Sequence, residues 1–317
     1  MGSAFSSPRY TRPRVPGGRL TLATGVPVMA TEQAAKTVIY YTPYIGDSVF
    51  LYDGTGWVAR TFTELSINLA ASANWAADKN FDVYVVDDGG TLRLVTGAAW
   101  TDGTTRAESL TMVNGFYTNN ASMTGRYGAS STMTVAANRG LYVGTFRASA
   151  NGTTTWELGG SAAGGDPVVL YVWNAFHRVG VRAQVFDSTS SWTYATATIR
   201  AANAGHASGG VNNRASYVCG LAEDSVAASY CNFPSAAGGV SAQIGIGVSS
   251  TSAFTGTMAY SASATSSENE MTGSYCGTPG IGYRYLQAVE RASGATITFY
   301  GLNSGIFQTG LSFDGRF

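Results

Sequence analysis

Charged residues are scarce in this sequence. They make up 12% of its 317 residues, whereas an ordinary soluble domain has roughly 25%. The 19 basic and 19 acidic side chains also cancel to a formal net charge of zero. A free monomer of this kind has little electrostatic protection against self-association. The composition therefore favours a surface that lies largely inside an assembly.

Lysine and cysteine are rare as well. Lys36 and Lys79 are the only lysines, and this bias toward arginine is typical both of a GC-rich genome and of planar contacts at interfaces. The three cysteines, Cys219, Cys231 and Cys276, form no CxxC pair, which disfavours a disulfide framework and a zinc site. We expect free, mostly buried thiols in a protein made in a reducing cytoplasm.

Segments for targeting or membrane insertion are not recognisable. The first twenty residues lack the apolar core of a signal peptide. No stretch approaches the roughly 18 apolar residues that a membrane helix needs. We therefore expect no membrane insertion.

Motifs that would carry chemistry are also missing. His177 and His206 lie in unlike contexts, and no GxSxG nucleophile elbow accompanies them. Gly280 and Gly282 precede an alternating strand pattern with no lysine, which indicates a turn rather than a phosphate-binding loop. Acidic pairs fall in predicted turns without the spacing of a calcium loop: Asp87 with Asp88, Glu223 with Asp224, and Glu268 with Glu270. We predict no catalytic residues, no metal site, no cofactor and no enzymatic activity.

The first 35 residues differ from the rest of the chain. Pro8, Pro13 and Pro16 favour an extended path, and no acidic residue comes before Glu32. We predict an extended anchoring arm over residues 1–35 that docks onto its own domain, onto neighbouring subunits or onto other proteins of a particle. Its docking residues are Arg9, Arg12, Arg14 and Arg19. Arginine arms also bind phosphate, but the rest of the chain has no basic surface, so we do not expect nucleic acid as a partner.

Short runs of β-branched and aromatic residues fill the chain from residue 36 onward, separated by glycine- and aspartate-rich turns. The clearest hairpin is FDVYVVDDGGTLRLVTGAAW, with its turn at residues 87–90. We predict an all-β protein built from antiparallel β-sandwich or jelly-roll-like domains. The expected parts are an N-terminal β domain over residues 36–148, a glycine-rich hinge over 149–166 and a C-terminal β-sandwich over 167–317.

Tryptophans lie beside the ends of predicted strands, at positions Trp57, Trp100, Trp156, Trp173 and Trp192. Tryptophan rings on a sheet can stack on sugars, and they can also fill a sandwich core or a subunit interface. The sequence leaves open whether these five are glycan or interface aromatics or belong to the core.

Several separated blocks resemble structural proteins of phages and prophages. They are RLTL at residues 19–22, residues 26–28, YYTPY at 40–44, LYDG at 51–54 with Trp57, YVWNAFHRV, DSTSSWTYATATIRAAN, and TPGIGYRYLQAVE followed by TITFYG. The resemblance implies a tail-fibre, spike or head-appendage component of the virion, made in the cytoplasm of the host bacterium. It implies no catalytic residue, and it leaves the position on the head or the tail open.

Two functions follow as expectations. The first is a structural component of a phage virion, a fibre, spike or capsid decoration, that docks by its N-terminal arm and assembles as a homo-oligomer, with a trimer favoured. The alternative is a receptor- or carbohydrate-binding adhesin module at the tip of a phage appendage, with a host surface glycan as its partner in host attachment. A polysaccharide depolymerase is disfavoured, because such enzymes tend to be longer, repetitive β-helices and this chain has no fixed-period repeat.

Overall fold

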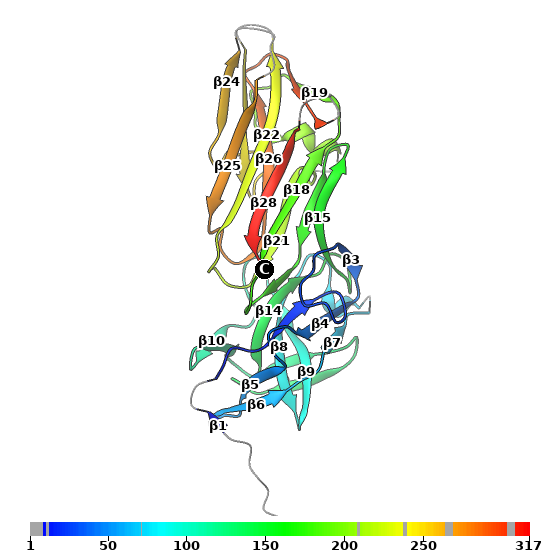
Figure 1. Cartoon of the computed structure of the whole chain (residues 1–317), viewed down its shortest axis with the longest axis vertical. Helices are drawn as coiled ribbons and strands as arrows, with labels where there is room; N and C mark the ends of the chain where they lie inside the picture. The colour runs from blue at the N-terminus through cyan, green and yellow to red at the C-terminus, as the bar shows by residue number, and fades with distance from the viewer. Residues whose placement is uncertain are drawn as a thin grey trace, which may run out of the picture.

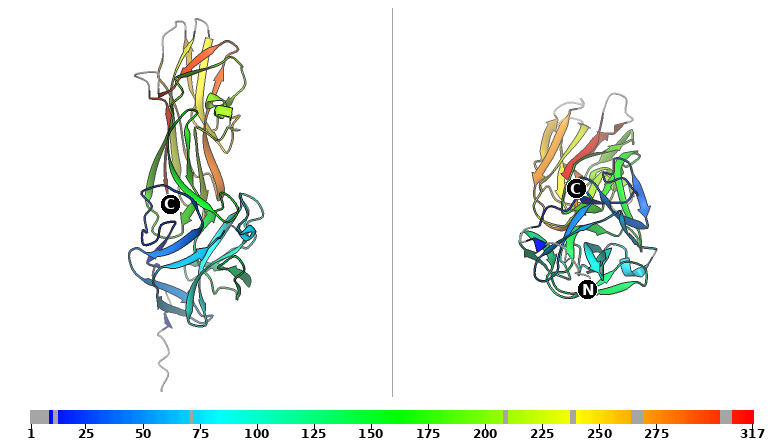
Figure 2. Two further views of the ribbon diagram at one scale, coloured as in Figure 1. Left: turned by 90° about the vertical axis from the view of Figure 1, so that its right-hand side faces the viewer. Right: turned by 60° about the horizontal axis from the view of Figure 1, so that its bottom comes forward.

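The computed structural model describes residues 9–10, 13–70, 72–207, 210–236, 240–263, 269–302 and 308–317. The fold is all-β, as predicted, with 56% of residues in strands and 3% in helix. Within the described residues, no helix is long and apolar enough to cross a membrane. The molecule is elongated and has two tiers stacked end to end (Figures 1 and 2).

The N-terminal tier contains two small sheets, with strand orders β1-β6-β5 and β2-β4-β7. Their strands are β1 (Arg9–Tyr10), β2 (Gly18–Thr21), β4 (Val38–Pro43), β5 (Ser48–Tyr52), β6 (Trp57–Thr61) and β7 (Leu65–Asn68). A short 3-10 helix, η1 (Ala73–Trp75), follows them. Strand β1 pairs with the outer edge of β6 at the pole of the molecule that lies farthest from the C-terminal tier (Figure 1).

An eight-stranded sheet completes the N-terminal tier, in the order β10-β11-β14-β8-β9-β12-β13, with β17 paired to β14. Its strands are β8 (Asn80–Asp88), β9 (Thr91–Ala99), β10 (Leu110–Val113), β11 (Phe116–Asn119), β12 (Met123–Arg126), β13 (Thr132–Val135), β14 (Leu141–Arg147) and β17 (Val172–Asn174). The predicted β8–β9 hairpin is confirmed. Gly89 and Gly90 both have positive φ, as this tight turn requires, and the Gly90 N–H donates to Asp87 Oδ1 at 2.7 Å.

The C-terminal tier is one continuous fourteen-stranded sheet with the main order β19-β27-β22-β28-β18-β15-β16-β21-β26-β23-β24, joined by β3, β20 and β25 at its margins. The strands are β3 (Gln33–Lys36), β15 (Thr154–Ala162), β16 (Asp166–Leu170), β18 (Gly180–Asp187), β19 (Ser191–Tyr194), β20 (Arg200–Ala201), β21 (Arg214–Cys219), β22 (Val226–Ala236), β23 (Val240–Val248), β24 (Ala259–Ser263), β25 (Met271–Gly277), β26 (Gly282–Ala292), β27 (Ile297–Tyr300) and β28 (Gly310–Arg316). A second 3-10 helix, η2 (Ala202–Ala207), follows β20.

This large sheet folds over on itself into two layers. Strand β22 packs against β23, and β25 lies against β23 and β24. Strand β22 alternates strictly between buried and half-buried residues, as expected of a strand with one face on a core. The sandwich interior is therefore filled by the inward positions, such as Tyr230, Ile244 and Phe313.

The two tiers share a continuous hydrophobic core and are joined by polar contacts. The N–H of Tyr283 donates to the carbonyl of Gly103 at 2.7 Å, and Arg106 donates to the carbonyl of Gly220. The Arg147 guanidinium also lies 4.0 Å from the centre of the Tyr283 ring. These contacts hold the tiers together as one packed unit.

The predicted glycine-rich hinge is wrong, and part of the predicted arm is built into the sheets of its own chain. The glycine-rich hinge over 149–166 is instead strand β15 followed by a turn, and β15 pairs with β16, β18 and β3. The arm over 1–35 includes β2, which is fully buried, and β3, which belongs to the large sheet. Strand pairing on both sides of β15 excludes a hinge in the first segment, and β2 and β3 show that the later part of the arm docks onto its own chain.

Candidate functional site

The four arginines predicted to dock the arm have different environments. Arg9 lies in β1, opposite Val58 of β6. Arg14 is exposed, and Arg12 lies outside the described residues. Arg19 lies in β2 and is 2% exposed. The structure therefore does not gather the four into one docking surface.

Arg19 is a structural residue of the core, so of the alternatives predicted for the arm, docking within its own chain is the one that fits Arg19. Its guanidinium donates to the main-chain oxygens of Pro27 and Phe317, each at 3.0 Å, and to the carbonyl of His177. Burial lowers the pKa of Arg19 to about 10. The side chain thus joins an early strand to the last residue of the chain.

The five tryptophans are all buried, between 0 and 9% exposed. Trp57 packs on Phe116, Trp156 meets Phe317 edge to face, and Trp192 stacks on Phe299. Of the roles that the sequence left open for Trp57, Trp100, Trp156, Trp173 and Trp192, the burial of their rings supports the core of this chain rather than a glycan or interface surface. A sugar-stacking platform would need other residues.

The acidic pairs serve turns and ion pairs. Asp87 and Asp88 pair with Arg60 and Arg93, each at 2.6 Å. Glu223 and Asp224 both pair with Arg178, at 2.9 and 2.6 Å. Glu268 lies outside the described residues.

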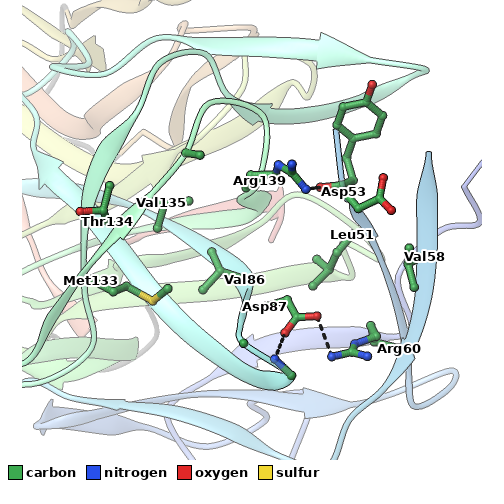
Figure 3. A pocket seen from close by; sticks show the side chains of 14 residues that line it. Leu51, Asp53, Val58, Arg60, Val86, Asp87, Met133, Thr134, Val135 and Arg139 are labelled. Atoms are coloured by element: carbon green, nitrogen blue, oxygen red, sulfur yellow. Dashed lines mark hydrogen bonds and ion pairs between the residues drawn. The ribbon is translucent and has the colours of Figure 1, made fainter. Parts of the chain in front are cut away.

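A cleft of about 430 Å³ lies in the N-terminal tier, between the β5–β6 hairpin, the β8–β9 turn and strand β13 (Figure 3). Its floor is apolar and is formed by Leu51, Val58, Val86, Met133 and Val135. On one rim the Arg60–Asp87 ion pair ties β6 to the β8–β9 turn. On the other rim Arg139 reaches the carbonyl of Tyr52 at 3.5 Å. This arrangement can hold an extended apolar segment between two charged rims.

A second hollow, of about 750 Å³, lies on the outer surface of the C-terminal tier over β28, β22 and β25. Short side chains are among its lining residues, including Ser229, Ser274 and Ser312. Arg182, Asp314 and Arg316 also line it. The hollow is therefore a shallow groove across a sheet face rather than an enclosed pocket.

A buried carboxylate in the C-terminal tier has an unusual pKa. Glu290 of β26 is fully buried, and it accepts hydrogen bonds from Trp192 Nε1 at 2.9 Å and from Arg200 Nε at 2.8 Å. Burial raises the pKa of Glu290 to about 7, although Arg200 and the hydrogen bonds act in the opposite direction.

This raised pKa predicts a pH-dependent stability. Between its ordinary pKa of 4.5 and about 7, Glu290 holds a proton in the folded chain that the unfolded chain releases. Stability therefore falls as the pH rises through this window, by roughly 3 kcal/mol from this group. Urea unfolding from pH 4.5 to 7.5 measures it, and the difference between the wild type and E290Q isolates the contribution. If the free energy of unfolding changed with pH equally in the wild type and in E290Q, Glu290 would not be the group responsible.

Comparison with known proteins adds no functional assignment. No protein-family model matches the sequence, and no curated protein matches it significantly. Among solved structures, the chain is similar to the crystal structure of the insecticidal delta-endotoxin Cry8Ea1 from Bacillus thuringiensis, with 6% sequence identity and a TM-score of 0.23. The match covers 94% of this chain and 51% of that protein, so this chain spans about half its length. A TM-score this low carries no argument about fold or function.

Proposed function

We propose that this chain is a structural subunit of a phage virion, in a tail or head fibre, a spike or a decoration. It docks by its N-terminal arm and assembles as a homo-oligomer, with a trimer favoured. The supporting sequence blocks are those that resemble phage and prophage structural proteins. Three of them, at residues 19–22, at 40–44 and at 51–54 with Trp57, fall in or beside β2, β4, β5 and β6 of the N-terminal tier.

One observation carries the proposal, namely the position of β1. This strand lies at one pole of an elongated all-β molecule, and the long strands of the C-terminal tier point to the other (Figure 1). Strand β1 is attached at the edge of its sheet by a ladder of only two residue pairs. Edge strands are sites where another chain can add backbone hydrogen bonds. Anchoring at one pole would project the C-terminal tier away from the particle.

The adhesin alternative uses the opposite pole. Strands β22, β23 and β24 extend to that pole, where a tip could meet a host receptor or surface glycan (Figure 1). The burial of the five tryptophans excludes their rings as the platform for sugar binding. Binding of the full-length chain to an array of host-type polysaccharides tests this alternative.

Truncation of the arm tests the proposed docking. We expect deletion of residues 2–12 to reduce incorporation into particles to background, while the purified protein unfolds at an unchanged temperature. Residues 13–317 keep β2 and Arg19, and β1 contributes only two paired residues to the fold. Quantitative immunoblots of particles from the phage or prophage that encodes the chain measure incorporation. Normal incorporation of the truncated protein would overturn the docking role of the arm.

A further inference from the structure

Strands β18, β28, β22 and β25 lie side by side (Figure 1). The residues on their outer face have mostly short side chains. We call this surface the serine face. Its residues form three cross-strand rows, which are Arg182–Asp314–Ala227–Cys276, Gln184–Ser312–Ser229–Ser274 and Phe186–Gly310–Cys231–Thr272. All twelve are exposed or half-buried.

The shortness of these side chains is not required by the fold. Along β22 the inward positions, such as Val226, Ala228 and Tyr230, pack into the sandwich, and the outward positions alternate with them. The outward residues are therefore free to be long and charged, as they usually are where a sheet faces water. Instead, the two rows away from Arg182 and Asp314 contain no charged residue.

A face of this kind is well suited to close contact with another protein surface. Serine, alanine and glycine lose little side-chain entropy when they are buried, whereas lysine, arginine and glutamate lose up to about 2 kcal/mol each. Short side chains also let the facing backbone approach closely. Hydroxyl groups supply donors and acceptors in both directions, so polar atoms can be satisfied across a contact.

The extent of the face is compatible with an interface. A neighbouring groove of about 470 Å³ over β15 and β18 shares Arg182 with the hollow of about 750 Å³, so the surface continues onto β15. Five strands about 4.8 Å apart and three rows about 7 Å apart cover roughly 400 Å², which is about half of what one partner contributes to a standard interface.

The charges at the end of the face identify its partner. Arg182 and Asp314 lie side by side, 3.5 Å apart, and their side chains are 78% and 56% exposed. An exposed pair of this kind contributes little to the stability of its own chain. Because each copy carries both signs next to each other, Arg182 of one copy can pair with Asp314 of a second copy, and the same contact can repeat around a symmetry axis. The face is thus complementary in charge to itself.

We propose that the serine face is the contact surface between copies of this chain. The inference rests on the homo-oligomer of the proposed function and deepens it by naming the surface that is buried. It requires neither the arm nor a second kind of protein.

The cysteines provide a direct readout. Cys276 is exposed on this face, Cys231 is half-buried on it, and Cys219 is buried inside the chain. Burial raises the pKa of Cys219 to about 12 and also raises that of Cys231. Cys276 is therefore the thiol that a maleimide should modify first in a monomer, and the proposed contact should protect it.

The experiment combines molar mass with thiol labelling of the full-length protein. Light scattering after size exclusion gives the oligomeric state over a range of concentrations, and mass spectrometry follows maleimide addition to Cys276. We expect an oligomer in which Cys276 is protected. S229R, at the centre of the face, should raise the dissociation constant about tenfold or more and restore monomer-like labelling. S66R, on an exposed position of β7 outside the face, is the matched control. It should change neither the dissociation constant nor the labelling of Cys276.

The possible failures are distinct. If S229R still forms the oligomer and Cys276 stays fully reactive, the serine face is not the contact surface, although the homo-oligomer itself is retained. A chain that is monomeric at every concentration would overturn both. A monomer in which added polysaccharide protects Cys276 would overturn the contact in favour of glycan binding on this face.

Discussion

Replacing Asp82 with asparagine is expected to lower the free energy of unfolding by about 3–5 kcal/mol, the usual cost of leaving a buried charge without its partner. Asp82 is 4% exposed and accepts hydrogen bonds from Arg106 Nε and Thr145 Oγ1, each at 2.7 Å. In D82N the Arg106 guanidinium would remain enclosed without a counter-charge. Arg106 also lies 4.6 Å from the centre of the Trp100 ring and donates to the carbonyl of Gly220, so the joint between the tiers would weaken with it.

Equilibrium unfolding in urea measures this loss, and the chain offers a matched control. Asp88 pairs with Arg93 at 2.6 Å, but these two side chains are 39% and 34% exposed. Exposed ion pairs contribute about 0–1 kcal/mol, so D88N should be close to the wild type. Equal losses of the free energy of unfolding in D82N and D88N would contradict the prediction that the buried ion pair contributes more than the exposed one.

The second large effect is expected for Arg19. R19M should cost about 3 kcal/mol. Three main-chain acceptors lose a charged donor, at roughly 1.5–3 kcal/mol for each hydrogen bond, and part of this loss is offset because methionine carries no desolvation cost of a buried guanidinium. The acceptors belong to Pro27, His177 and Phe317, so the substitution would loosen β2 from the end of the chain. R14M changes an exposed arginine five positions earlier and should leave the free energy of unfolding unchanged.

The comparison of R19M with R14M separates stability from docking. We expect urea unfolding to show a lower free energy of unfolding for R19M and no change for R14M. Any effect of R14M should appear only in particle incorporation. A stable R19M protein would contradict the role of Arg19 as a core residue.

Local chemistry was sufficient to predict the strand content and the β8–β9 hairpin. Alternating apolar residues set one buried face, and the glycines after Asp88 supply the positive φ values of the turn. The same local logic failed for the glycine-rich segment. Gly159 has a φ of +78°, and a Cβ there would lie 2.5 Å from the carbonyl of Gln184. Its glycines therefore allow close approach of β18 rather than flexibility, and that neighbour is distant in sequence.

Residue environment was the harder part of the candidate site to predict. Arg14 and Arg19 share the same proline-rich context, and what distinguishes them is a hydrogen bond from Arg19 to Phe317 across 298 positions. The tryptophans were ambiguous for the same reason, because a position near a strand end does not determine whether the ring lies on the buried or the exposed face of the sheet.

Asp187 is a further case in which only the fold shows the role. Its carboxylate accepts hydrogen bonds from the main chain of Gly164 and Thr189 and from the side chains of Asn203 and Asn213. These partners come from four segments that tertiary structure brings together around the end of β18. The serine face has the same origin, because its rows exist only once four strands have paired in register.

The most direct test of the account is the protein composition of intact particles. Particles released by the bacterium that encodes this chain can be purified on a density gradient and analysed by quantitative mass spectrometry. The account predicts peptides of this chain in the particle fraction, at a fixed number of copies relative to the other particle proteins. Particles that are complete and infectious without any peptide of this chain would contradict it.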